Sequence, residues 1–98
     1  MREITPQEVE TLLKQGKSLN ILDVREVTEV AEGKIPGAVN LPLGWIEFRM
    51  HELDSRKEYI VVCRSGGRSA SAVQFLEGKG FNVINMQGGM LAWTGEVE

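Results

Sequence analysis

The amino-acid sequence predicts an α/β fold, with a mostly parallel sheet of about five short strands and helices on both faces. Three observations carry this prediction. Short apolar runs alternate along the chain with segments of helical periodicity. Runs such as 60–62 are continuously apolar, which is typical of strands covered on both faces. Glycine and proline stand at the junctions, where they end one element before the next begins.

The chain has the size and composition of one globular domain, residues 1–98. A hydrophobic fraction of 42% suffices for one core, and 26% of the residues are charged. The net charge of −3 argues against nucleic acid as a partner. No apolar run approaches the roughly 20 residues of a membrane span, and the N-terminus lacks the apolar segment of a signal peptide. We therefore expect a cytoplasmic protein that binds neither nucleic acid nor a membrane.

The first elements are a short strand at Ile4 and a helix directly after it. Thr5 is suited to cap that helix, and Pro6 fits its first position. Glu8 stands three residues after Thr5, which is the spacing of a capping box. Gly16 follows the last apolar position of the pattern and predicts the end of the helix.

The middle of the chain alternates in the same way. Residues 19–24 are predicted to form the second strand, and residues 26–32 one or two helical turns. A brief strand is expected at 38–41, after a Pro-Gly turn and before a further proline. Residues 43–53 carry enough apolar side chains to predict a helix that packs on one face of the sheet.

The last third contains the most regular signals. Residues 59–62 predict a buried strand, and a helix is expected from about Arg68 to the glycine at 78. Residues 81–86 are predicted to form the final strand. A short closing helix is expected near 90–93, after a Gly-Gly turn.

The only cysteine, Cys63, stands where a buried strand is followed by a helix. Ligands of open α/β sheets bind beyond the carboxyl ends of the strands, and a helix N-terminus favours an anion. Gly66 and Gly67 allow backbone N–H groups to turn inward around the sulfur. Arg64 and Arg68 are expected to lower the pKa of the thiol and to attract an anionic substrate. Cys63 is therefore predicted to be a nucleophile rather than a buried structural cysteine.

Different reactions of a cysteine nucleophile need different partners. Cysteine proteases pair the thiol with a histidine, but the only histidine, His51, lies in a polar stretch and is expected at the surface. No group of cysteine and histidine has metal-ligand spacing, and no metal or organic cofactor is implied. A thiolate held by amides and arginines, without a general base, suits the transfer of an atom onto sulfur, because no proton leaves the nucleophile during attack.

Four segments carry a resemblance to a known family: LDVRE at 22–26, IPGAVNLP at 35–42, YIVVCRSGGRS at 59–69 and FNVINMQGGMLAW at 81–93. In this order they resemble the rhodanese domain family, a sulfurtransferase fold, over nearly the whole chain. Each segment alone is modest evidence, and the four together are specific. The family often has histidine where this chain has Lys34. Little depends on this difference, because the segment after it is structural rather than catalytic.

The resemblance implies a single-domain rhodanese, a thiosulfate sulfurtransferase in which Cys63 accepts a sulfane sulfur and becomes a persulfide. The donor would be a small anion such as thiosulfate. The acceptor would be cyanide in the laboratory, and a thiol or a protein cysteine in cells. The loop after the cysteine would bind the substrate through Arg64, Ser65, Gly66, Gly67 and Arg68. Because the chain has no second cysteine, the persulfide must be discharged to an external thiol or a thioredoxin-like protein.

Asp23 and Arg25 match the family's acidic and basic pair at the end of the second strand. One interpretation is a surface ion pair of little energetic weight. The interpretation we favour is that Asp23 accepts hydrogen bonds from the loop or from an arginine and so holds the site in shape. The strand that ends near Asp23 and the strand that ends before Cys63 finish at the same edge of the predicted sheet, so the two residues are expected to lie close together.

Two other functions stay open. One is a docking module without turnover, for which Trp45, Phe48 and Met50 would form an exposed patch instead of core or pocket rim. The presence of Cys63 with both arginines argues against it. The other is a phosphatase or an arsenate reductase of the same fold, whose loop is longer by one residue than the four residues between Cys63 and Arg68. The shorter loop leaves less room for a tetrahedral oxyanion, which favours sulfur transfer.

Overall fold

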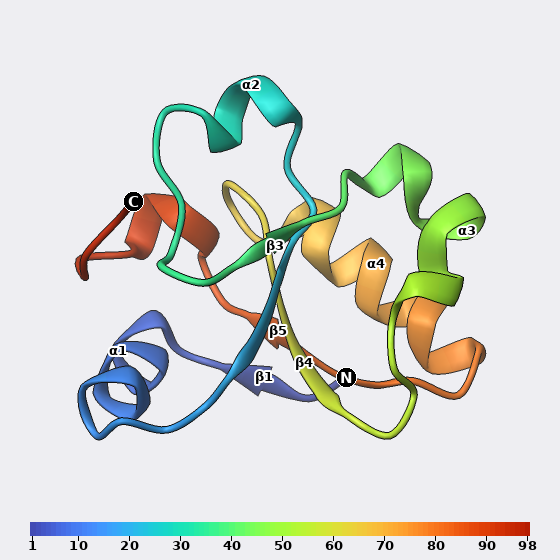
Figure 1. The fold of residues 1–98 in the computed structure, drawn as a ribbon, viewed down its shortest axis with the longest axis horizontal. Coiled ribbons are helices and arrows are strands. Elements are labelled where there is room, and N and C mark those ends of the chain that lie inside the picture. The colour runs from blue at the N-terminus through green and yellow to red at the C-terminus, as the bar shows by residue number, and fades with distance from the viewer.

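The protein, seen in a computed structural model that describes all 98 residues, is built around one five-stranded sheet. The strand order is β1-β5-β4-β2-β3, and all neighbouring strands are parallel (Figure 1). The strands are β1 (Glu3–Ile4), β2 (Asn20–Asp23), β3 (Val39–Asn40), β4 (Glu58–Val62) and β5 (Asn82–Met86). The predicted α/β class is confirmed, and the sheet is wholly rather than mostly parallel.

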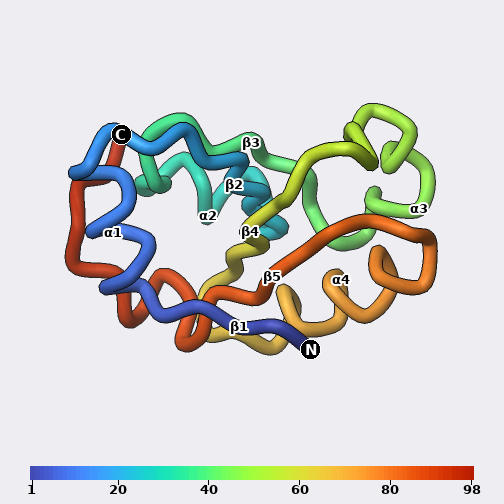
Figure 2. The backbone as a smooth tube through the Cα atoms, turned by 90° about the horizontal axis from the view of Figure 1, so that it is seen from below, coloured from blue at the N-terminus to red at the C-terminus, as the bar shows by residue number.

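Helices cover both faces of this sheet, as predicted. The α-helices are α1 (Pro6–Lys14), α2 (Val27–Val30), α3 (Ile46–Arg49) and α4 (Gly67–Gly78), and the 3-10 turns are η1 (Leu43–Trp45), η2 (Met50–Glu52) and η3 (Gly89–Ala92). In two perpendicular views, α1 lies on one side of the strands and α3 with α4 on the other (Figure 1, Figure 2). The short helix α2 lies beyond the carboxyl ends of the strands (Figure 1).

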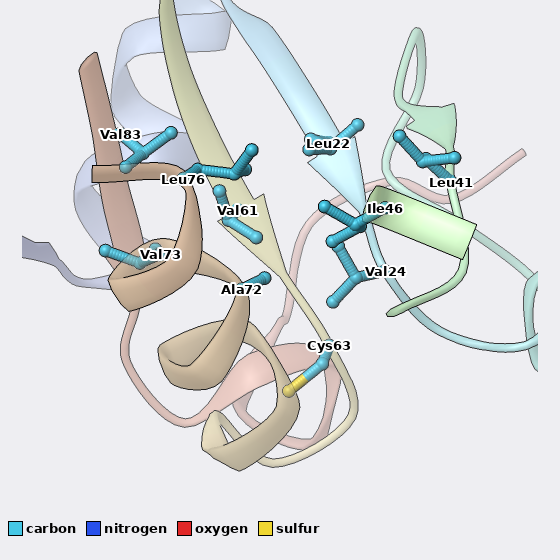
Figure 3. Close-up of a cluster of buried hydrophobic side chains, with 10 residues drawn as sticks. All are labelled: Leu22, Val24, Leu41, Ile46, Val61, Cys63, Ala72, Val73, Leu76 and Val83. Atoms are coloured by element: carbon cyan, nitrogen blue, oxygen red, sulfur yellow. The ribbon is translucent and has the colours of Figure 1, made fainter. Parts of the chain in front are cut away.

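Each central strand contributes side chains to two separate cores. Leu22 and Val61 belong to the cluster on the α4 side (Figure 3). Their neighbours Ile21 and Ile60 belong to the cluster on the α1 side. Successive residues of a strand point to opposite faces, so a strand covered on both sides must be apolar at every position. This geometry explains the continuous apolar runs of the sequence.

The start of α1 has the capping box that the sequence predicts. The Glu8 N–H donates to the Thr5 side-chain oxygen at 3.1 Å, and the Thr5 N–H donates to the Glu8 carboxylate at 3.1 Å. Pro6 occupies the first turn, where no backbone donor is needed. The helix ends at Lys14, shortly before Gly16 with its φ of +77°.

The segment 43–53 contains a helix, as predicted, but its α-helical part is short. The segment consists of η1, α3 and η2 in succession. The backbone leaves α geometry at Trp45 (φ −105°, ψ −4°) and at Arg49 (φ −117°, ψ 3°), which interrupts the regular ladder of hydrogen bonds. Trp45 and Phe48 are 58% and 72% exposed, so they are not core, whereas Met50 packs against the core.

Candidate active site

The loop of Cys63 lies at the carboxyl edge of the sheet, as the topology requires. β4 ends at Val62 and α4 begins at Gly67, so residues 63–66 alone connect them. The end of β2 lies beside this loop, because Asp23 is the parallel partner of Val62. The Cys63 side chain is 1% exposed and points toward α4 (Figure 3). A molecule that reacts with the sulfur must therefore enter the loop.

The sulfur of Cys63 is held by hydrogen bonds. The Gly66 N–H donates to Sγ at 3.0 Å, and the Ser69 hydroxyl oxygen lies 3.3 Å from Sγ. Gly66 has a φ of +105°, which only glycine adopts readily. Burial raises the pKa of the Cys63 thiol, but hydrogen bonds from Ser69, Gly66 and Ser65 outweigh it, so the pKa lies below its ordinary value. Amides and a hydroxyl, more than the arginines, stabilise the thiolate.

The two arginines of the loop differ in their surroundings. The Arg68 guanidinium donates to both carboxylate oxygens of Glu29 on α2, at 2.6 and 2.8 Å. The hydrogen bond from Arg68 holds the pKa of the Glu29 carboxyl at about 2, so this acid is ionised at neutral pH. The Arg64 side chain is exposed and forms no ion pair. Only Arg64 therefore offers a free positive charge next to Cys63.

The Asp23 and Arg25 side chains form a buried pair beside the loop. Asp23 is 1% and Arg25 6% exposed, and the guanidinium donates to the carboxylate from Nε at 3.0 Å and from Nη2 at 2.8 Å. Arg25 also donates to the carbonyl of Gly33 at 2.8 Å and to that of Glu29 at 3.4 Å. The pair contacts α2 rather than Cys63, so it fixes the helix that carries Glu29.

A second buried polar contact lies on the other side of the sulfur. The Ser69 hydroxyl lies 2.5 Å from the side-chain oxygen of Asn85 on β5, and 3.2 Å from the carbonyl of Gly66. Ser69 and Asn85 are 0% and 3% exposed. A hydroxyl has one hydrogen to donate. When Cys63 is a thiol, its S–H donates to the Ser69 oxygen and the Ser69 hydroxyl donates to the Asn85 oxygen; a thiolate accepts that hydroxyl hydrogen only in competition with Asn85.

Replacing Ser69 by alanine is expected to raise the pKa of the Cys63 thiol, because the thiolate loses its side-chain hydrogen bond. The rate of alkylation by iodoacetamide follows the thiolate, so its midpoint should move to higher pH in Ser69→Ala. Ser71→Ala is the control, because Ser71 is exposed on the same helix and should leave the midpoint unchanged. Coinciding profiles for Ser69→Ala and the unaltered protein would contradict this role.

Sequence reasoning missed Glu29, Ser69 and Asn85. Ser69 had a usable signal, since it lies near the start of the helix that begins beside Cys63. The sequence signal for Glu29 was weaker: it stands three residues after Glu26, at capping-box spacing. In the structure its side chain accepts a hydrogen bond from the Glu26 N–H at 3.1 Å. Nothing in the sequence pairs Asn85 with the loop, because only the sheet order brings β5 beside β4.

The structure gathers no three His, Cys, Asp or Glu side chains in a way that could hold a metal ion. None of its helices has the length and apolar character needed to cross a membrane.

Comparisons with known proteins agree with this architecture. The family model of the rhodanese-like domain matches residues 5–96. YtwF of Bacillus subtilis (strain 168) is 42% identical over 98 residues, which cover 100% of this chain and 95% of that protein. GlpE of Pseudomonas syringae pv. syringae (strain B728a), a thiosulfate sulfurtransferase by name, is 34% identical over 93 residues, or 94% of this chain and 86% of that protein.

Solved structures give the same result. The crystal structure of a rhodanese-like domain protein from Staphylococcus aureus is similar with a TM-score of 0.94 at 37% identity, over 100% of this chain and 97% of that one. The match of the family model and the likeness of sequence and fold lead to one conclusion: this chain belongs to the rhodanese-like domain family.

Proposed function

We propose that this protein moves a sulfane sulfur from an anionic donor such as thiosulfate to a thiophilic acceptor, through a persulfide on Cys63. The observation that carries the proposal is the hydrogen-bonded sulfur: Sγ accepts from the Gly66 N–H at 3.0 Å and has the Ser69 hydroxyl at 3.3 Å. These donors lower the pKa of the Cys63 thiol and so favour the thiolate. The name of the similar GlpE supports thiosulfate as the donor.

The first step needs no general base. The Cys63 thiolate attacks the outer sulfur of thiosulfate, a sulfur–sulfur bond forms, and the bond inside thiosulfate breaks. Sulfite leaves with the electron pair, and the new persulfide keeps one negative charge in the loop. The amides of Ser65, Gly66 and Gly67 are suited to stabilise that charge, because successive N–H groups at a helix start form an anion-binding concavity.

The second step returns the thiolate. An acceptor thiolate, or cyanide in the laboratory, attacks the outer sulfur, and Cys63 leaves as the thiolate. Cys63 is the only cysteine of the chain, so no second thiol of this chain takes the sulfur. The acceptor is therefore an external thiol or a thioredoxin-like protein with an exposed cysteine.

The other charged residues have supporting roles in this proposal. Arg64 is exposed and unpaired, so it recruits the anionic donor by long-range attraction. Asp23 and Arg25 position α2 beside the loop through the Glu29 and Gly33 carbonyls. We also infer that residues 1–98 act as one domain, because both cores share the same sheet.

A docking module without turnover is the competing function, and one observation favours it. Trp45 and Phe48 are exposed and lie edge to face with 6.5 Å between their ring centroids. Such a pair can anchor a protein partner. A docking role alone does not explain why the sulfur of Cys63 is surrounded by hydrogen-bond donors. Sulfur transfer accounts for both features, because an acceptor protein must also bind.

Mass spectrometry of the non-reduced protein after incubation with thiosulfate tests the proposed function. The expected result is one added sulfur on the unaltered protein and none on Cys63→Ala. Addition of cyanide should remove the sulfur and release thiocyanate. If no sulfane donor, including an alkyl persulfide, adds sulfur to Cys63, the proposal is wrong and the docking module takes its place.

A further inference from the structure

The most unusual feature of the candidate site is a carboxylate directed at its own anion-binding loop. Glu29 holds the Arg68 guanidinium through two hydrogen bonds, at 2.6 and 2.8 Å. The Arg68 side chain is 34% and the Glu29 side chain 28% exposed, so the pair lies half-buried between α2 and α4. Two short parallel hydrogen bonds of this kind are the strongest form of an arginine–carboxylate contact.

The Glu29 carboxylate is fixed before any substrate arrives. One of its oxygens also accepts the Glu26 N–H at 3.1 Å, which closes a capping box around α2. The backbone of the same helix is held by Arg25, which donates to the Glu29 carbonyl, and Arg25 is in turn held by the buried Asp23. The buried pair thus positions Glu29, and Glu29 positions Arg68.

This arrangement changes the charge that an incoming donor meets. Arg68 is neutralised by Glu29, and Arg64 alone is unpaired. A dianion such as thiosulfate must compete with a carboxylate that is already in place and pass close to its negative charge. A persulfide or polysulfide of lower charge meets a much smaller penalty, because Coulomb repulsion scales with the product of the charges.

We propose that Glu29 is a specificity-determining residue, which withholds Arg68 from small dianionic donors and so favours persulfide donors of lower charge. This inference rests on the proposed sulfur transfer at Cys63 and names the donor class. The reaction is balanced without an oxidant. The Cys63 thiolate attacks the outer sulfur of RS–SH, the new sulfur–sulfur bond forms as the RS–S bond breaks, and the thiolate RS⁻ leaves.

Glu29→Gln is the decisive variant, because glutamine keeps the size of the side chain and an oxygen that can accept from Arg68. The KM for thiosulfate is expected to fall about fivefold, as for loss of one repulsive charge near the surface. The KM for an alkyl persulfide should change less than twofold. The difference in the KM for thiosulfate between Glu29→Gln and the unaltered protein should become smaller in 1 M salt, because salt screens charges in the exposed part of the site.

Two further variants separate this role from a structural one. Glu32→Gln removes an exposed acid shortly after α2 and should leave both KM values unchanged. Arg68→Gln leaves the Glu29 carboxylate without its counter-charge, so it should raise the KM for thiosulfate and change the KM for an alkyl persulfide much less. In the Glu29→Gln background it should raise the KM for thiosulfate several-fold. The double variant should therefore lose the lower KM of Glu29→Gln, as expected if that lower KM comes from the freed charge of Arg68.

Protection of Cys63 from iodoacetamide by sulfate tests the inference without turnover. Sulfate is a dianion that carries no sulfane sulfur, and it should protect Glu29→Gln at lower concentration than the unaltered protein. An unchanged or weaker protection, or an unchanged or raised KM for thiosulfate, would overturn the specificity role. Absence of sulfur loading from every donor would instead overturn the proposed function, while the protection assay still decides the role of Glu29.

Discussion

Replacing Asp23 by alanine is expected to lower the free energy of unfolding by about 3–5 kcal/mol, because the Arg25 guanidinium then stays buried without a counter-charge. The two side chains are 1% and 8% exposed. Their fork of hydrogen bonds, at 3.0 and 2.8 Å, joins the end of β2 to the segment that leads into α2. The remaining partners of Arg25 are the carbonyls of Glu29 and Gly33, whose dipoles do not neutralise a full charge.

The chain itself offers a matched control. Asp54 precedes Arg56 as Asp23 precedes Arg25, two residues ahead in both cases. Its carboxylate oxygen accepts from the Arg56 N–H at 2.9 Å and from Nε at 3.0 Å. The Arg56 side chain is 89% exposed, so water solvates it when the acid is removed. Asp54→Ala is therefore expected to change stability far less than Asp23→Ala.

Urea unfolding followed by the fluorescence of the two tryptophans measures both variants. We expect a clear fall in the midpoint for Asp23→Ala and a small shift for Asp54→Ala. Equal shifts would mean that burial adds nothing to the strength of the pair. If Asp23→Ala does not fold at all, Asp23→Asn, which keeps one acceptor for Arg25, should fold with an intermediate loss of stability.

Local chemistry in the sequence was sufficient for much of the fold. The capping box of Thr5 and Glu8 marks the start of α1, and the apolar run before Cys63 marks a strand buried on both faces. Each of these two signals is contained in a stretch of only a few consecutive residues. The segment 43–53 was predicted less well, because its apolar spacing does not reveal the two residues, Trp45 and Arg49, at which the backbone leaves α geometry.

In the candidate site, too, contacts between residues close in sequence were predictable and contacts between distant segments were not. Cys63 and Gly66 are close in sequence, and the sequence anticipates amides around the sulfur. Contacts from distant segments were not predictable. Glu29 and Arg68 are 39 residues apart, and Ser69 and Asn85 are 16 residues apart. Both contacts depend on where the parallel sheet places β2 and β5 relative to β4, which no single segment encodes.

At Gly89 the backbone after β5 lies close to the backbone of the Cys63 loop. Gly89 is the first residue of η3, shortly after β5, and has a φ of +58°. The amides that follow it hold the loop: the Met90 N–H donates to the Cys63 carbonyl at 2.8 Å, and the Leu91 N–H donates to the Arg64 carbonyl at 2.9 Å. A Cβ at Gly89 would lie 2.5 Å from the carbonyl carbon and oxygen of Arg64, and closer to the carbonyl oxygen of Cys63.

Gly89→Ala is expected to lower the free energy of unfolding by about 2–5 kcal/mol, since left-handed strain of about 1–2 kcal/mol adds to about 1–3 kcal/mol of overpacking. Gly80→Ala is the control, because Gly80 has a φ of +90° and nothing within 4 Å of its added Cβ. The free energy of unfolding of Gly80→Ala should fall only by the part that comes from left-handed strain, about 1–2 kcal/mol. Moving the Cys63 and Arg64 carbonyls also disturbs the amides around the sulfur, so Gly89→Ala, unlike Gly80→Ala, should raise the pKa of the Cys63 thiol in the alkylation assay. A loss of stability equal to that of Gly80→Ala, with an unchanged alkylation profile, would show that the turn after β5 does not support the loop.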